Sequence, residues 1–149
     1  MLFAKAPDSA PLELKIDERV RIVDLGHVPP IEACRGDLSA YLPTIARETL
    51  RLAQSGDVTV LPNQHGDCFG IAAALSQILG ERIRIIGTAH SDNAYDQRLL
   101  THYAPMLSRF VAVSRTLESK LRRALPARID DIARIPYGCL LYTSPSPRD

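Results

Sequence analysis

The chain has 149 residues, a length that suits one globular domain with a core of its own. Hydrophobic residues make up 46% of the sequence and charged residues 23%, a composition that argues against disorder. Lysine and arginine total 18 against 17 acidic residues, so the net charge of +1 predicts no nucleic-acid partner. The three cysteines exclude a disulfide framework and indicate a reducing, cytoplasmic compartment.

We expect neither a signal peptide nor a membrane-spanning helix. The most apolar stretch, Cys68–Leu79, is shorter than the roughly 20 residues that a spanning helix needs. The N-terminal residues lack a basic segment followed by a long apolar one. The basic residues Lys120, Arg122 and Arg123 are interpreted as a solvated helix face, with peripheral contact to an anionic membrane surface as the alternative.

The last eleven residues, Cys139–Asp149, contain two Ser-Pro steps and have no strand or helix periodicity. This segment resembles the translated read-through of a transposon-type sequencing-library adapter; the alternative is a natural proline-rich tail. We interpret it as a non-native tail, and in either case it is excluded from the fold prediction. If the adapter begins at Cys139, the gene continues beyond Gly138, and we expect residues 1–138 to be a partial domain.

In chain order, apolar and β-branched runs predict six strands, at Leu2–Lys5, Val20–Leu25, Val58–Leu61, Arg82–Ala89, Phe110–Val113 and Ile132–Ile135. Helical spacing predicts four helices. The first ends at Ala53 and has Asp37 as its N-cap, and the second spans Phe69–Leu79 and is ended by Gly80. The third begins with Asp92 or Asn93 as its cap and runs to Tyr103, and the fourth spans Thr116–Leu125. Alternating strands and helices predict βαβ units, and therefore an α/β, Rossmann-like fold with a mostly parallel sheet and helices on both faces.

Ligands of such folds bind beyond the carboxyl ends of the strands. The polar residues expected there are Asn63, Gln64, His65 and Asp67 after the third strand, His90, Ser91, Asp92 and Asn93 after the fourth, Ser114 and Arg115 after the fifth, and Tyr137 and Gly138 after the sixth. Helices begin just behind several of these positions, and their free N–H groups favour an anion. The pattern therefore predicts a hydroxyl-rich or phosphorylated ligand.

Structural explanations compete with this interpretation. Asp92, Asn93 and Ser114 are good helix N-caps, and we expect capping to be their main role. For His90, which has no capping preference, a functional and a structural role are equally open. His65 is also compatible with a simple turn.

Two other chemistries are less favoured. A metal site built from His65, Asp67, His90 and Asp92 lacks the usual ligand signatures, so we expect no metal. Cys68, at the start of an apolar helix, is expected to act as a small hydrophobic side chain rather than a nucleophile.

Five segments, taken in order, carry a family resemblance: Val20–Gly26, Gly56–Pro62, Ile85–His90, Phe110–Ser114 and Ile135–Gly138. Together they resemble the N-terminal domain of retaining GT-B glycosyltransferases of the family-4, or glycosyltransferase group 1, type. The resemblance covers residues 1–138. It implies an acceptor-side domain that faces a second, C-terminal domain holding a nucleotide-sugar donor.

By this resemblance, His90 is the catalytic residue that hydrogen-bonds the transferred sugar and stabilises the charged transition state. The acceptor rim would be formed by Asn63, Gln64, Ser91 and Asp92, with His65 and Asn93 beside them. The cleft floor would be lined by Ser114 and Arg115. The chain would continue into the interdomain linker through Tyr137 and Gly138. The implied partners are a sugar or glycolipid acceptor and the donor domain of the same parent chain. No cofactor is implied beyond the nucleotide-sugar donor, which is a substrate.

The sequence departs from the family at both ends. The glycine-rich turn after the family's first strand is absent, and no pair of glutamates with the donor-domain spacing occurs. We therefore expect the parent to transfer a sugar with retention, and the fragment alone to be inactive. The alternative is a non-catalytic Rossmann-like module that binds a small anionic or sugar ligand. A third, less favoured hypothesis is a metal-dependent hydrolase.

Overall fold

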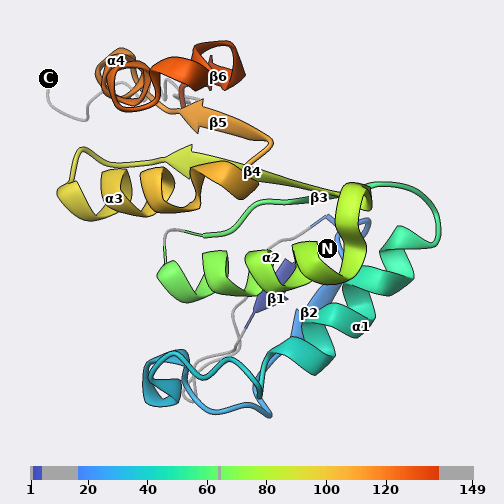
Figure 1. Ribbon diagram of the computed structural model, residues 1–149. Helices are drawn as coiled ribbons and strands as arrows, with labels where there is room; N and C mark the ends of the chain where they lie inside the picture. The colour runs from blue at the N-terminus through green and yellow to red at the C-terminus, as the bar shows by residue number, and fades with distance from the viewer. Residues whose placement is uncertain (1, 5–16, 64, 138–149) are drawn as a thin grey trace, which may run out of the picture. The chain divides into compact units, whose positions relative to one another are not determined.

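A computed structural model describes residues 2–4, 17–63 and 65–137 (Figure 1). Gln64, Gly138 and the segment 139–149 lie outside the described residues. The fold is α/β and Rossmann-like, as the alternating pattern predicts. Four parallel strands, β3 (Val58–Val60), β4 (Ile83–Ala89), β5 (Arg109–Ala112) and β6 (Ile132–Arg134), form one sheet in that order, flanked by helices.

The chain divides into two compact units, residues 1–86 and 87–149, and each is described by itself. In the first unit, β1 (Leu2–Ala4) and β2 (Ile22–Asp24) pair in parallel as a separate two-stranded sheet. A 3-10 turn, η1 (Ile31–Cys34), leads to α1 (Leu42–Ala53). After β3 come α2 (Gly66–Leu79) and the short η2 (Gly80–Arg82). α1 packs against α2 and β3.

The two helices of the first unit form for different reasons. α1 is amphipathic: its buried positions Ile45, Glu48, Thr49 and Ala53 repeat at helical spacing. α2 is apolar over most of its length and buries five side chains, Phe69, Ile71, Ala72, Leu75 and Leu79. Gly80 ends it with φ of 55°, a backbone conformation that favours glycine, as the sequence predicts.

Two helix starts differ from the prediction. Asp37 is not the N-cap of α1: its Oδ1 accepts a hydrogen bond from the Ser39 backbone N–H at 3.0 Å, while Tyr41 holds the N-cap position without a side-chain cap. A local turn of this kind competes with capping because it uses the same carboxylate oxygen. α2 begins at Gly66 rather than Phe69, because His65 caps it.

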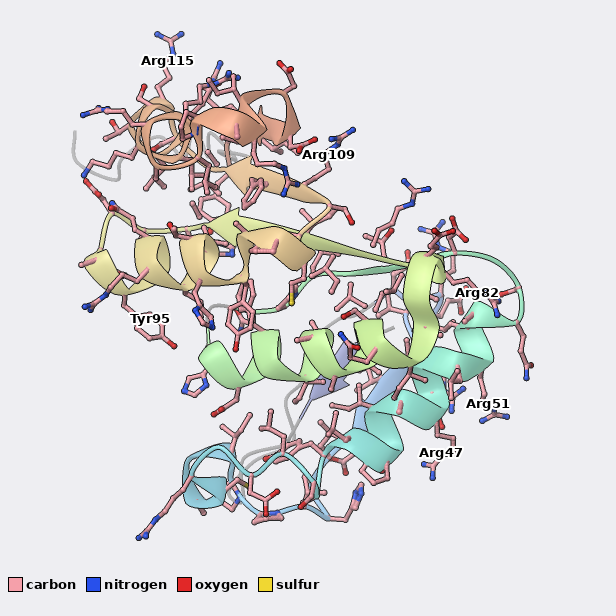
Figure 2. The ribbon with its side chains drawn as sticks, viewed as in Figure 1. Arg47, Arg51, Arg82, Tyr95, Arg109 and Arg115 are labelled. Atoms are coloured by element: carbon pink, nitrogen blue, oxygen red, sulfur yellow. The ribbon has the colours of Figure 1, made fainter. Side chains whose placement is uncertain are left out.

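Glu48 is a buried acid that the sequence pattern does not identify. Its side chain is 6% exposed and is paired with Arg21, Arg47 and Arg51 at 2.9, 3.5 and 3.7 Å. Arg47 and Arg51 project from α1 (Figure 2). Because Arg21 directly precedes β2, its ion pair ties the start of that strand to α1.

The second unit contains the end of β4, α3 (Ala94–Tyr103), η3 (Ala104–Met106), β5, α4 (Arg115–Ala124), η4 (Pro126–Asp131) and β6. α4 packs against β5 and β6. Phe110 and Ala112 of β5 are fully buried, and Leu100 and Leu107 are almost as inaccessible. Gly87 in β4 lies against Leu100 and Leu107: a Cβ at this position would meet their methyl groups at 2.7 and 2.6 Å. The strand therefore needs glycine here.

Arg128 holds the segment before β6. Its Nη1 and Nη2 donate to the carbonyl oxygens of Ala104 and Leu107 at 2.9 and 2.7 Å, and its Nε donates to Asp131. The guanidinium also stacks over Phe110, 5.2 Å from the ring centroid. One side chain thus joins η3, η4 and the buried β5.

Among the residues that the structure describes, no helix has the length and apolar character needed to cross a membrane.

Candidate functional site

The ends of three strands in the second unit lie at one edge of the sheet. The Val113 N–H donates to the Ala89 carbonyl at 3.3 Å, and the Ile135 N–H donates to the Ala112 carbonyl at 3.0 Å. These bonds align the ends of β4, β5 and β6, because parallel strands share one direction. The residues that follow the three strands, here called the carboxyl edge, are His90, Ser91, Asp92, Asn93, Ser114, Arg115 and Tyr137.

His90 and Tyr137 are in direct contact. The Tyr137 hydroxyl is hydrogen-bonded to Nδ1 of His90, and the two rings stack with centroids 5.9 Å apart and planes inclined at 23°. His90 is partly buried and Tyr137 is 63% exposed. The sequence predicts both residues as candidate site residues but gives no sign of their contact.

Ser91 and Asn93 belong to a network centred on a buried acid, Asp96, which is 5% exposed. Ser91 Oγ donates to Asp96 Oδ2 at 2.6 Å, and Asn93 Nδ2 donates to Ser91 Oγ at 2.6 Å. Asn93 Oδ1 accepts from the Asp96 N–H at 2.7 Å, which makes Asn93 the N-cap of α3, as predicted. Asp96 is not among the predicted site residues, although an acid three residues after an N-cap resembles a capping box.

Asp92 does not cap α3, contrary to the capping role expected for it. Its Oδ1 accepts from Lys120 Nζ and, at 3.2 Å, from Gln97 Nε2. This ion pair joins the start of α3 to α4 and neutralises one of the three basic residues of the α4 stripe. Arg122 is likewise paired, with Glu118 at 3.2 Å. Two residues of the stripe are therefore partnered rather than freely solvated.

A cavity of about 10 Å³ lies between α3 and α4. This volume holds roughly one water molecule. Its lining residues are Ala89, Ser91, Asp96, Gln97, Leu100, Leu117, Lys120, Leu121 and Ala124. It is a packing feature beneath the carboxyl edge and is too small for a sugar.

Ser114 and Arg115 start α4. Ser114 Oγ accepts from the Leu117 N–H at 3.2 Å, so the predicted capping role of Ser114 is confirmed. Arg115 is exposed and projects from the start of the helix (Figure 2). Its guanidinium is thus an exposed cationic group on the first residue of α4.

The predicted residues after β3 lie in the first unit. His65 is the N-cap of α2: its Nδ1 accepts from the Asp67 N–H at 3.4 Å and lies 3.2 Å from Asp67 Oδ2. Asn63 is exposed. Because the two units are described separately, the expectation that Asn63 and His65 join the carboxyl edge stays a prediction.

Burial raises the pKa of the Cys68 thiol, with a smaller opposing effect from a hydrogen bond to Asn63. Cys68 is partly buried. A protonated thiol is a poor nucleophile, which agrees with the interpretation of Cys68 as a small hydrophobic side chain. Among residues 2–4, 17–63 and 65–137, no group of three or more His, Cys, Asp or Glu side chains is arranged to hold a metal ion.

The fold and this edge define a Rossmann-like α/β protein with a polar, imidazole-containing edge at the carboxyl ends of its strands. Comparison with protein-family models, curated proteins and solved structures found no match.

Proposed function

We propose that the chain is the acceptor-side domain of a retaining GT-B glycosyltransferase, which transfers a sugar from a nucleotide-sugar donor to a sugar or glycolipid acceptor. The family resemblance of residues 1–138 is the starting point. The observation that carries the proposal is the joining of His90 and Tyr137, which follow β4 and β6, at the edge where Rossmann-like folds bind ligands.

The chemistry of the carboxyl edge suits sugar hydroxyls. Ser91, after donating to Asp96 and accepting from Asn93, keeps one oxygen lone pair for a ligand hydroxyl. His90 supplies an imidazole, and Arg115 supplies a cation for a phosphate group. Retaining transfer passes through a positively charged, oxocarbenium-like sugar with a departing diphosphate, so positioned donors and charges accelerate it.

In this proposal, His90 hydrogen-bonds the transferred sugar, and Ser91 and Asn93 hold the acceptor. Lys120 forms an ion pair with Asp92, and Arg122 forms one with Glu118. Because these two basic side chains already have acidic partners, contact with an anionic membrane surface is not part of the proposal.

The second candidate is a module that binds a small anionic or sugar ligand without catalysis. The network around Asp96 favours this second candidate, because its hydrogen bonds hold the Ser91 hydroxyl in a fixed position without contacts from another domain. The two candidates differ in what the parent gene encodes. The transferase requires a donor domain, whereas the binding module does not.

The test begins with the parent gene that the transferase proposal requires. We expect it to encode a second α/β domain with paired glutamates, and the full protein to transfer sugar from a mixture of nucleotide-sugars. Replacing His90 by Ala should then lower kcat/KM by about 10²-fold or more, as loss of a transition-state donor does. The thermal midpoint should change little.

His102→Ala is the matched control, because His102 is an exposed histidine on α3, away from the carboxyl edge. This variant should retain both activity and stability. Equal loss of activity and stability in His90→Ala would make His90 structural. Absence of a donor domain and of transfer would favour the binding module, while turnover by residues 1–149 alone would contradict the need for a donor domain.

A further inference from the structure

Tyr137 is an exposed side chain with an unusual contact. It lies 47 residues from His90 in the sequence, yet its hydroxyl bonds Nδ1 of that ring and its own ring stacks on it. Because Tyr137 is 63% exposed, the contact buries little apolar surface. Its main consequence is for the imidazole rather than for the core.

The backbone fixes this contact from both sides. β6 pairs with β5 through Phe110 and Ile132, and the hydrogen bond from the Ile135 N–H to Ala112 extends the pairing past the end of the strand. On the other side, the Val113 N–H donates to the carbonyl oxygen of Ala89, the residue directly before His90. Tyr137 and His90 are thus each within two residues of a ladder hydrogen bond.

The direction of this bond determines which nitrogen of a neutral imidazole carries the ring proton. A neutral imidazole has one N–H donor and one acceptor nitrogen, and a phenol is a good O–H donor. When the Tyr137 hydroxyl donates to Nδ1, the proton of the ring must reside on Nε2. No hydrogen bond joins Nε2 to another residue within the described part of the chain, so Nε2–H remains available for a ligand.

We propose that Tyr137 is a positioning residue: by donating to Nδ1 it fixes His90 as the Nε2–H tautomer and restrains the ring, so that His90 presents an uncharged N–H donor to an oxygen of the ligand. This inference deepens the proposed function and rests on it for the identity of that oxygen, a sugar hydroxyl or the departing phosphate oxygen. The tautomer itself belongs to the ligand-free chain.

The same geometry makes His90 a donor rather than a general base. A base would need a lone pair on the nitrogen that faces the ligand, and the Nε2–H tautomer has none there. Retaining transfer through an oxocarbenium-like state gains from such a donor, because negative charge grows on the departing oxygen.

The test is the nitrogen chemical shifts of the histidine rings in the ¹⁵N-labelled chain without ligand, measured at alkaline pH where imidazoles are neutral. In the wild-type chain, Nε2 of His90 should show an N–H shift and Nδ1 a lone-pair shift. In Tyr137→Phe, which keeps the ring but removes the hydroxyl, the two shifts should move toward each other as the tautomers mix.

Two controls accompany this experiment. His102, on the surface of α3, is an internal reference whose shifts should not respond. Tyr95→Phe removes a different tyrosine hydroxyl, on a side chain that projects from α3 (Figure 2), and should leave the His90 shifts unchanged. Folding of each variant is checked by its backbone amide spectrum, so a shift change is not mistaken for unfolding.

A proton on Nδ1 of His90 in the wild-type chain would overturn the inference, as would His90 shifts that are identical in Tyr137→Phe. Because no sugar is present, such a result would leave the transferase proposal standing. Conversely, failure of the full protein to transfer sugar would leave the tautomer assignment intact.

Discussion

Gly87 provides a stringent test of the packing beneath the carboxyl edge. A methyl group at this position in β4 would lie 2.6 Å from Leu107 and 2.7 Å from Leu100. Carbon atoms pack best at about 3.5–4.0 Å, so both leucines would have to retreat by about 1 Å. Such overpacking costs about 1–3 kcal/mol, offset by about 0.5 kcal/mol because alanine suits a strand better than glycine. We therefore expect Gly87→Ala to lower the free energy of unfolding by about 0.5–2.5 kcal/mol.

The assay is urea unfolding of the full chain, with the midpoint expected to fall and the slope to stay constant. Thr88→Ala is the control, since it changes the neighbouring, partly exposed residue of the same strand. In the double variant Gly87→Ala with Leu107→Ala, the new methyl occupies space that the shortened side chain has vacated. The double variant should thus be less destabilised than the sum of the singles. Wild-type stability for Gly87→Ala, or strictly additive effects, would refute this packing.

Two further predictions concern single side chains. Arg128→Ala should lower the free energy of unfolding by about 2–4 kcal/mol, because it removes the charged donor of two part-buried carbonyls and a cation–π contact. Arg128→Lys should recover a minority of this loss. An unchanged urea midpoint in Arg128→Ala would show that the contacts are not formed. Cys68 should make the chain less stable at alkaline pH, because burial raises the pKa of its thiol in the folded state. The contribution of the protonated thiol to the free energy of unfolding is complete below the ordinary thiol pKa of about 8.5. This contribution is lost as the pH rises toward the higher pKa of the folded state. The decline in unfolding free energy between these pH values should be smaller in Cys68→Ala, and equal declines in both proteins would contradict the assignment.

Much of the fold follows from local sequence. β-branched runs such as Ile83–Ala89 are predicted as strands, and Gly80 ends α2 because few other residues adopt its backbone conformation. Asn93 and Ser114 are recognisable as N-caps from residue type alone. The same rule is wrong for Asp37, because its short side chain accepts a hydrogen bond from the backbone of a nearby turn instead of capping the helix.

The candidate site is less predictable, because its contacts join residues far apart in the sequence. The strand ends predict that His90 and Tyr137 share an edge, but their contact depends on the registers of β4, β5 and β6 together. Lys120 pairs with Asp92 across 28 positions, and no local pattern signals it. Asp96 can be buried because the Ser91 hydroxyl donates a hydrogen bond to its carboxylate. Amino-acid composition does not reveal this hydrogen bond.

The central claim, that the carboxyl edge holds a sugar, is tested most directly by mapping binding on the ¹⁵N-labelled chain. Methyl hexopyranosides are added to millimolar concentrations, a range suited to weak acceptor binding. We expect concentration-dependent shifts in the amides of His90, Ser91, Ser114 and Tyr137, and we expect these shifts to be lost in His90→Ala but not in His102→Ala. Shifts confined to residues away from this edge, or none with any of the sugars, would contradict it.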